Sequence, residues 1–281
     1  MIPSILKGKR KNTWILETVM IGIAILFFIP IYYLIVTTFK TPAEATLHPM
    51  SIPWNIDFSN YVDAWNAMKY PKVLMNTLIV TVSSVVGIIL FSAMAAYSLA
   101  RHASAGNRFL FMFFLAGLMI PFQMGLVSLY KLINALNIMD NLLAVIFVNV
   151  GSGVVIAIFL FHSFILASVP IELEEAASID GCSTQRTFWW ITFPLLKPVV
   201  ATVAIIATLN VWNDFMNPLL FLQSRENNVI LLEVFRNIGQ FSVDWTKLFP
   251  MLLLGVAPLM TFYLIMQRYI IKGVAAGALK G

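Results

Sequence analysis

Charge and cysteine are scarce in this chain, and each shortage excludes a class of protein. Of its 281 residues, 11% are charged and 60% are hydrophobic, and the mean hydropathy is +0.87. A water-soluble domain carries roughly a quarter charged residues. The single cysteine, Cys182, excludes an internal disulfide framework and a cysteine-based metal site. The composition therefore predicts a polytopic membrane protein.

The motifs of several chemistries are also missing. The sequence has no G-x-x-x-x-G-K-[ST] phosphate loop, so any ATP dependence must come from another polypeptide. His48, His102 and His162 lie far apart and show no metal-ligand spacing. The apolar segments contain one clear carboxylate, Asp214, and no paired acid and base, which argues against an intramembrane enzyme and a proton-coupled carrier. The net charge of +5 is scattered over segment ends, so it indicates membrane topology and not nucleic-acid binding.

Six segments are apolar and long enough to cross a bilayer, which takes about 20 residues each. The first resembles a secretory signal, but its uncharged run is too long and no small-x-small cleavage site follows, so we expect a retained span. The predicted fold class is an all-α membrane protein, with six transmembrane helices over residues 18–271, an N-terminal segment (1–17) and a C-terminal tail (272–281). The predicted spans are Thr18–Phe39, Val73–Ala100, Phe109–Tyr130, Leu142–Leu166, Pro198–Leu222 and Leu248–Ile271.

The positions of Lys and Arg predict the orientation of these spans. With the N-terminus inside, eleven of the 18 basic residues fall on the inner side and seven on the outer side, and four inner ones cluster before the first span. Both termini and the loop at about residues 168–196 are therefore predicted to face the cytoplasm. The longer outer segments, 41–72 and 223–247, are either docking surfaces for an extracytoplasmic protein or simple connecting loops.

The inner loop at about residues 168–196 carries the local signals of a helical hairpin. Pro170 suits the first turn of a helix, where the helix dipole also favours the carboxylates that follow, Glu172, Glu174 and Glu175. Gly181 is able to take a positive φ and end this helix. Ser183 is a suitable N-cap for a second helix, which we expect to end before Pro194.

Two interpretations of this hairpin remain open on the pattern alone. It is either a solvated loop with an interfacial aromatic belt or a coupling hairpin that seats in a cleft of a cytoplasmic subunit. In the second case, its acidic first turn would meet a basic residue of that subunit.

The hairpin resembles the loop of bacterial ABC importer permeases, whose pattern is EAA, three residues, Gly, nine residues, Ile, two residues, Pro. Glu175-Ala176-Ala177, Gly181, Ile191 and Pro194 stand at those spacings. Further matches resemble the carbohydrate branch, in particular the second permease of maltose-type importers (MalG-like). They are Phe39-Lys40, Asn60-Tyr61, Asn76-Thr77, Ala96-Tyr97 through Arg101, Trp212-Asn213-Asp214-Phe215 with Pro218, Gln267-Arg268-Tyr269 and the tail Gly277 to Gly281.

The resemblance implies a type I ABC importer permease fold in the bacterial cell membrane, with a cytoplasmic EAA-type coupling loop. It implies a noncatalytic subunit of an ATP-driven sugar or oligosaccharide importer. The implied partners are a related second permease, two ATPase subunits that hold ATP and Mg, and an extracytoplasmic sugar-binding protein. This chain itself would bind no cofactor or metal. The residues implied in ATPase coupling are Glu172, Glu174, Glu175, Ala176, Ala177, Asp180, Gly181, Ile191, Pro194, Lys280 and Gly281.

Polar residues also recur inside the fifth predicted span. Asn210, Asn213, Asp214 and Asn217 have the spacing i, i+3, i+4 and i+7, which places them on one face of a continuous helix. An Asp near the bilayer centre costs on the order of 3 kcal/mol, so this face is not expected to meet lipid. It is predicted to line a translocation path or, alternatively, to join helices by hydrogen bonds.

Small residues in two other spans favour close helix packing. The first pair is Ser83 with Gly87. The second group is Asn149, Gly151, Ser152 and Gly153, for which a local break of the helix that lines a cavity is the alternative. For the whole chain, the alternative function is a self-sufficient secondary transporter or channel, which would work without an ATPase.

Overall fold

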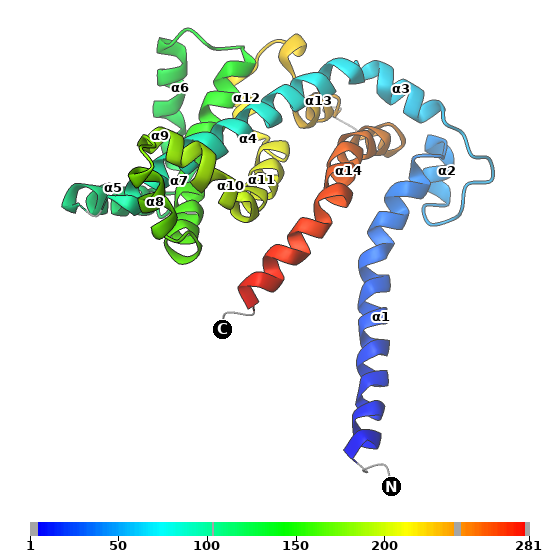
Figure 1. Ribbon diagram of the computed structural model, residues 1–281. Coiled ribbons are helices and arrows are strands. Elements are labelled where there is room, and N and C mark those ends of the chain that lie inside the picture. Colours follow the sequence, from blue (N-terminus) through cyan, green and yellow to red (C-terminus); the bar gives the residue numbers. More distant parts are fainter. Residues whose placement is uncertain (1–4, 103, 239–242, 279–281) are drawn as a thin grey trace. The chain divides into compact units, whose positions relative to one another are not determined.

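The computed structural model describes residues 5–102, 104–238 and 243–278, and every regular element in those ranges is a helix (Figure 1). Four helices are long and apolar enough to cross a membrane, or six if each of two bent pairs counts as one span. The four are Thr13–Thr37 within α1 (Ile5–Thr37), α4 (Tyr70–Arg101), α7 (Leu142–Ser168) and Trp245–Gln267 within α14 (Trp245–Ala278).

Shorter helices connect or extend these spans. They are α2 (Pro42–Leu47), α3 (Ser59–Ala67), α5 (Ala105–Gly117), η1 (Phe122–Gly125), α6 (Leu126–Ala135), α8 (Glu172–Ile179), α9 (Thr184–Thr187), the π-helical turn η2 (Phe188–Thr192), α10 (Phe193–Leu195), α11 (Lys197–Trp212), α12 (Met216–Phe221), η3 (Arg225–Asn227) and α13 (Ile230–Arg236).

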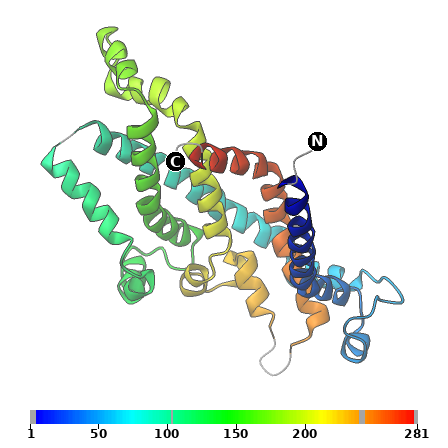
Figure 2. The same cartoon turned by 90° about the horizontal axis from the view of Figure 1, so that it is seen from below.

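The third predicted span, Phe109–Tyr130, is not one helix. It divides at Leu118–Pro121 into α5 and the η1–α6 segment, which meet at 97°. Pro121 lacks the N–H that a continuing helix needs and disfavours helical geometry at the preceding residue. Figure 2 shows the sharp bend that results.

The fifth predicted span, Pro198–Leu222, is also interrupted. Helix α11 ends at Trp212, Asn213 caps it, and α12 begins at Met216. Pro218 explains the break, because its ring clashes with the carbonyl of Asp214, four residues earlier, in a continuous helix. The prediction that four polar residues share one face of a single helix is therefore wrong.

The described residues fall into two compact units, one within Met1–Met68 and Arg236–Leu254, the other within Lys69–Phe235 and Gly255–Gly281. In the second unit, α4, α7 and α11 pack around a buried core that includes Ala93, Ile158 and Val203 (Figures 1 and 2). Trp212 ties α11 to the part of α14 that belongs to this unit, because its indole N–H donates to Gly255 O at 3.2 Å.

Close approach between α4 and α7 depends on two glycines. A Cβ at Gly87 would lie 2.8 Å from Val150 Cγ2, and one at Gly153 would lie 2.4 Å from Ile88 Cδ1. The packing role predicted for these residues is therefore confirmed at Gly87 and Gly153. Ser83 is exposed, and Gly151 has no neighbour within 4 Å of its added Cβ, so neither contributes to this contact.

The first unit is organised around a buried lysine. Lys40 is 1% exposed, and its ammonium donates to His48 O at 2.8 Å and Pro49 O at 3.0 Å. Asn60 Nδ2 donates to the carbonyl of Lys40 at 2.9 Å and to that of Thr38 at 3.0 Å. Burial lowers the pKa of Lys40, against a smaller upward effect of Glu44. These bonds fold the segment after α1 back on itself.

In the second unit, Asp140 joins the α6–α7 connection to the segment after α12. Its Oδ1 accepts from the amides of Gln223 and Ser224, both at 2.9 Å, and from the Ser224 hydroxyl at 3.0 Å. Burial raises the pKa of Asp140, but these bonds together with that from Asn227 outweigh burial, so the pKa is lowered. Asp140 adopts φ 55°, in the left-handed region.

The start of α4 is held by the same connection after α12. Asn76 Nδ2 donates to Glu226 O at 2.9 Å and Asn228 O at 3.0 Å, and Thr77 Oγ1 accepts from the Ile230 amide at 2.9 Å. The Asn76-Thr77 pair therefore fixes the path of the chain between α12 and α13.

We predict that Gly153→Ala destabilises the protein by about 1–3 kcal/mol, because the added methyl overpacks the contact with Ile88. Gly151→Ala is the matched control and is expected to be neutral or slightly stabilising, since nothing opposes its methyl. The apparent melting temperature in detergent measures both effects. An Ile88→Val change, which removes Cδ1, is expected to restore part of the stability of Gly153→Ala; equal melting temperatures for the two alanine variants would contradict the contact.

We predict that Asp140→Ala costs about 2 kcal/mol, because it removes a charged acceptor of several hydrogen bonds, and lowers the apparent melting temperature by about 4–8 °C. Since the folded-state pKa lies below the unfolded value of about 3.9, the contribution of Asp140 is complete above that pH and is lost as the pH falls through the folded pKa. Asp140→Asn keeps an acceptor and tolerates positive φ, so it is expected to lose less than Asp140→Ala. Melting temperatures measured from pH 6 to pH 3 test this ordering.

Candidate functional site

The hairpin between α7 and α11 has the turn that the sequence predicts. Helix α8 ends at Ile179, Gly181 adopts φ 80°, and the Cys182 amide donates to Ala177 O at 2.9 Å. The Ser183 side chain accepts from the Arg186 amide at 3.5 Å and caps α9. The positive φ of Gly181 and the capping role of Ser183 are both confirmed.

The expected end of the second helix before Pro194 is wrong. After α9 the chain makes the π-helical turn η2, in which the Phe193 amide donates to Phe188 O, five residues back. Pro194 then lies inside α10, and the chain bends by 76° into α11. The wider π turn changes the bonding register just before Pro194, which has no N–H to donate.

Aromatic rings pack the inner side of this bend. Phe188 is buried and lies 5.1 Å from the ring of Tyr97 and 4.8 Å from that of Trp189, between ring centroids. Trp190, by contrast, is 80% exposed. The aromatic run thus has one side that anchors the hairpin to α4 and another that is open to its surroundings.

The three glutamates of α8 do not share one environment. Glu172 and Glu175 are exposed, and within the described residues neither side chain makes a hydrogen bond or an ion pair. Ala176, Asp180 and Gly181 are also exposed, whereas Ala177 is buried. The side chain of Glu174 is only 10% exposed and points back into the protein.

Glu174 is surrounded by donors from other elements. Its Oε1 accepts from Arg101 Nη2 at 3.0 Å, Arg101 Nε at 3.1 Å and Thr192 Oγ1 at 2.9 Å. Its Oε2 accepts from Tyr97 Oη at 3.0 Å. Arg101 Nη2 also donates to Val169 O, just after α7, at 2.8 Å. We call this group of Tyr97, Arg101, Val169, Glu174 and Thr192 the Glu174 clamp.

Other residues predicted for ATPase coupling lie in different places. Ile191 is half-buried in the π turn, and Pro194 is exposed in α10. Lys280 and Gly281 lie outside the described residues, so the role predicted for the tail stays a prediction.

A second candidate site is a polar cavity of about 230 Å³ beside the break in the fifth span. Of the four predicted path residues, Asn210, Asp214 and Asn217 line it, whereas Asn213 is exposed and donates to Leu209 O at 2.8 Å. The other lining residues are Phe122, Gln123, Asn149, Ser152 and Met216.

The break in the helix is what brings these polar groups together. Asp214 accepts from the Asn217 amide at 3.2 Å through Oδ1 and from Asn217 Nδ2 at 2.8 Å through Oδ2. Asn217 Nδ2 also reaches Asn149 Oδ1 on α7 at 3.4 Å. The carboxylate of Asp214 thus accepts from a backbone amide in the first turn of α12, and the side chain of Asn217 connects α12 to α7.

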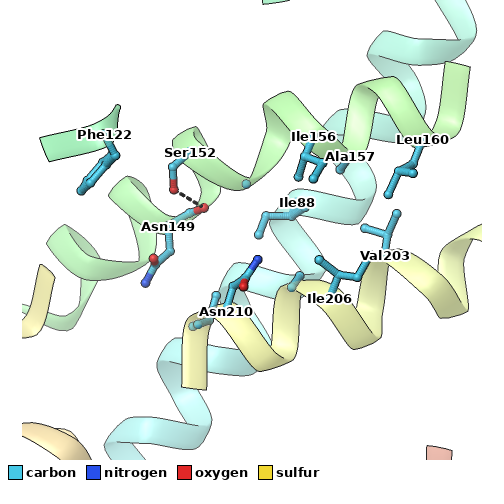
Figure 3. A pocket seen from close by; sticks show the side chains of 13 residues that line it. Ile88, Phe122, Asn149, Ser152, Ile156, Ala157, Leu160, Val203, Ile206 and Asn210 are labelled. Carbon is cyan, nitrogen blue, oxygen red and sulfur yellow. Dashed lines mark hydrogen bonds between the residues drawn. The ribbon is translucent and has the colours of Figure 1, made fainter. Parts of the chain in front are cut away.

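A neighbouring cavity of about 280 Å³ shares Phe122, Asn149, Ser152 and Asn210. Figure 3 shows these four residues grouped at one end and apolar residues such as Ile156, Leu160 and Val203 at the other. The local break predicted as the alternative for the small residues of α7 is wrong, because α7 is one continuous helix, although Asn149, Ser152 and Gly153 do line this cavity. Phe122 and Gln123 were missed, and only their place after Pro121 could have indicated an interrupted span.

Residues 88–276 match the family described as binding-protein-dependent transport system inner membrane component. The chain belongs to this family. It is 30% identical over 274 residues to the melibiose/raffinose/stachyose import permease protein MelC of Bacillus subtilis (strain 168), covering 98% of this chain and 99% of MelC. It is 32% identical over 280 residues to the multiple sugar-binding transport system permease protein MsmG of Streptococcus mutans, covering 98% of this chain and 100% of MsmG.

The fold is similar to a chain of the crystal structure of a bacterial ABC transporter involved in the import of the acidic polysaccharide alginate. The TM-score is 0.82 at 21% identity, and the match covers 93% of this chain and 97% of the other. The ABC importer permease fold that the EAA-type loop indicated is therefore confirmed. The protein is a multi-pass membrane permease subunit of an ABC import system.

Proposed function

We propose that this chain is a noncatalytic permease subunit of an ATP-driven importer of sugars or oligosaccharides, forming half of the translocation pathway. The observation that carries the coupling role is the exposed face of α8, where Glu172 and Glu175 have no side-chain partner among the described residues and lie beside the turn at Gly181. A short helix with unpaired carboxylates in its first turn suits a basic cleft on another protein.

The proposed complex contains a related second permease, two cytoplasmic ATPase subunits that hold ATP and Mg, and an extracytoplasmic sugar-binding protein. The bias of Lys and Arg supports a hairpin and termini on the cytoplasmic side. Closure of the ATPase subunits would move the hairpin, and the spans attached to it would switch between inward-open and outward-open states.

The polar cavity supports a path for neutral, hydroxyl-rich solutes. Its lining combines the amides of Gln123, Asn149 and Asn210 with the aromatic ring of Phe122. The one lining carboxylate, Asp214, already accepts hydrogen bonds from the backbone and side chain of Asn217. Amides replace the hydration of sugar hydroxyls without a strong charge, and aromatic faces pack against the apolar faces of sugar rings. Sugar substrates are also named for the relatives MelC and MsmG.

Purification of the tagged chain in mild detergent, followed by uptake assays with melibiose, raffinose and stachyose in vesicles, tests this function. We expect a second permease and ATPase subunits to copurify, and uptake of at least one sugar to require ATP and a binding protein. Uptake by the chain alone would instead favour a secondary transporter or channel.

We predict that Glu175→Lys weakens association with the ATPase subunits by about 10- to 100-fold, the range that corresponds to 1.4–2.8 kcal/mol. Glu226→Lys is the matched control, because Glu226 is also exposed but lies on the predicted outer side. Quantitative copurification measures both. Equal recovery of ATPase subunits with the two variants would remove the support for α8 as the docking helix.

We predict that Asn210→Leu lowers sugar uptake by about tenfold, because it removes a hydrogen-bonding group from the cavity, a loss of roughly 1.4 kcal/mol. Asn213→Leu is expected to leave uptake within about twofold, since Asn213 does not line the cavity. Initial uptake rates, normalised to the amount of assembled complex, compare the two. A larger effect at Asn213 would place the path elsewhere.

A further inference from the structure

Glu174 and Glu175 are neighbours in one short helix, yet their carboxylates face different surroundings. Glu175 is exposed and unpaired within the described residues, whereas both oxygens of Glu174 accept hydrogen bonds inside the protein. The guanidinium of Arg101 balances the charge of Glu174 at 3.0 Å. Glu174 therefore has no free acceptor direction and no unpaired charge to offer to a cytoplasmic subunit.

We propose that the Glu174 clamp is the joint through which the coupling hairpin moves the membrane helices, with Arg101 and Glu174 as positioning residues. The inference rests on the proposed function and differs from the sequence prediction, which grouped Glu174 with the residues that meet the ATPase. In this assignment Glu175 meets the partner and Glu174 fastens the hairpin.

The clamp connects several elements through one carboxylate. Tyr97 and Arg101 belong to the last turn and a half of α4, Thr192 lies in the π turn that leads to α11, and Val169 follows α7 directly. A force applied to α8 therefore reaches the ends of α4, α7 and α11 together. Bonds to a charged carboxylate resist displacement more than neutral bonds do.

The surroundings of the clamp make these bonds stiff. Thr192 is fully buried, Tyr97 is 8% exposed, and the side chain of Arg101 is 11% exposed. Screening by water and salt is weak at such sites, and loss of one partner leaves the other charge unpaired. A hairpin held in this way moves with the spans and does not swing on its own.

The single cysteine of the chain offers a direct test of attachment. Cys182 lies in the hairpin turn and is partly exposed, so a nitroxide label on it reports hairpin motion in the full chain without ATPase subunits. Glu174→Gln is expected to increase label mobility clearly. Glu175→Gln, the same chemical change one residue along, is expected to leave the mobility as in the unchanged protein. Equal spectra for the two variants would overturn the proposal.

Coupling is tested in the reconstituted complex with its partner permease, ATPase subunits and binding protein. Glu174→Gln is expected to retain the ATPase subunits but to lower the sugar transported per ATP hydrolysed by about tenfold. Either an unchanged ratio or a loss of ATPase subunits like that of Glu175→Lys would overturn the proposal. If the unchanged complex carries no sugar, the proposed function fails, while the label mobility still decides whether the clamp exists.

A double variant separates attachment from simple stability. Arg101→Met with Glu174→Met removes both charges, and apolar replacements of a buried ion pair often leave stability unchanged or higher. We expect this variant to regain the melting temperature lost by Glu174→Gln but to keep the low transport-to-ATP ratio. Recovery of the ratio together with the melting temperature would show a structural role only and overturn the proposal.

Discussion

A carboxylate removed from water needs donors on both oxygens, and that requirement organises the part of this protein around the α8–α9 hairpin. Glu174 meets it by drawing on α4, on the π turn and, through Arg101, on the chain just after α7. The aromatic contacts of Phe188 and the bend before α11 surround the same group. The hairpin is therefore built onto the spans, while the side chains of Glu172 and Glu175 stay exposed.

Helix interruptions are the second constraint on the fold, and they explain which spans could be predicted. Hydropathy found α1, α4, α7 and α14, because each stays apolar over a bilayer's thickness. It did not predict the interruptions near Pro121 and Pro218, because hydropathy counts apolar side chains and does not register that proline lacks a backbone N–H. Both interruptions border the polar cavity. Non-helical backbone at membrane depth is tolerated where it lines such a cavity.

The site residues also differ in how well the sequence predicts them, according to whether their role depends on local or distant contacts. Gly181 and Ser183 could be placed from sequence because turns and caps are local. The different surroundings of Glu174 and Glu175 could not, because they depend on Arg101, which lies 73 residues before Glu174. Likewise, Asn149 meets Asn217 across 68 residues, and only the folded chain shows that the two belong to one cavity.

The buried ammonium of Lys40 has a consequence for how such permeases diversify. It binds the backbone carbonyls of His48 and Pro49 and not their side chains. Every amino acid supplies that carbonyl, so the segment around α2 keeps its course whatever side chains it displays. Exposed positions such as Ile52 and Trp54 can therefore vary between permeases without a change in the backbone fold that Lys40 holds.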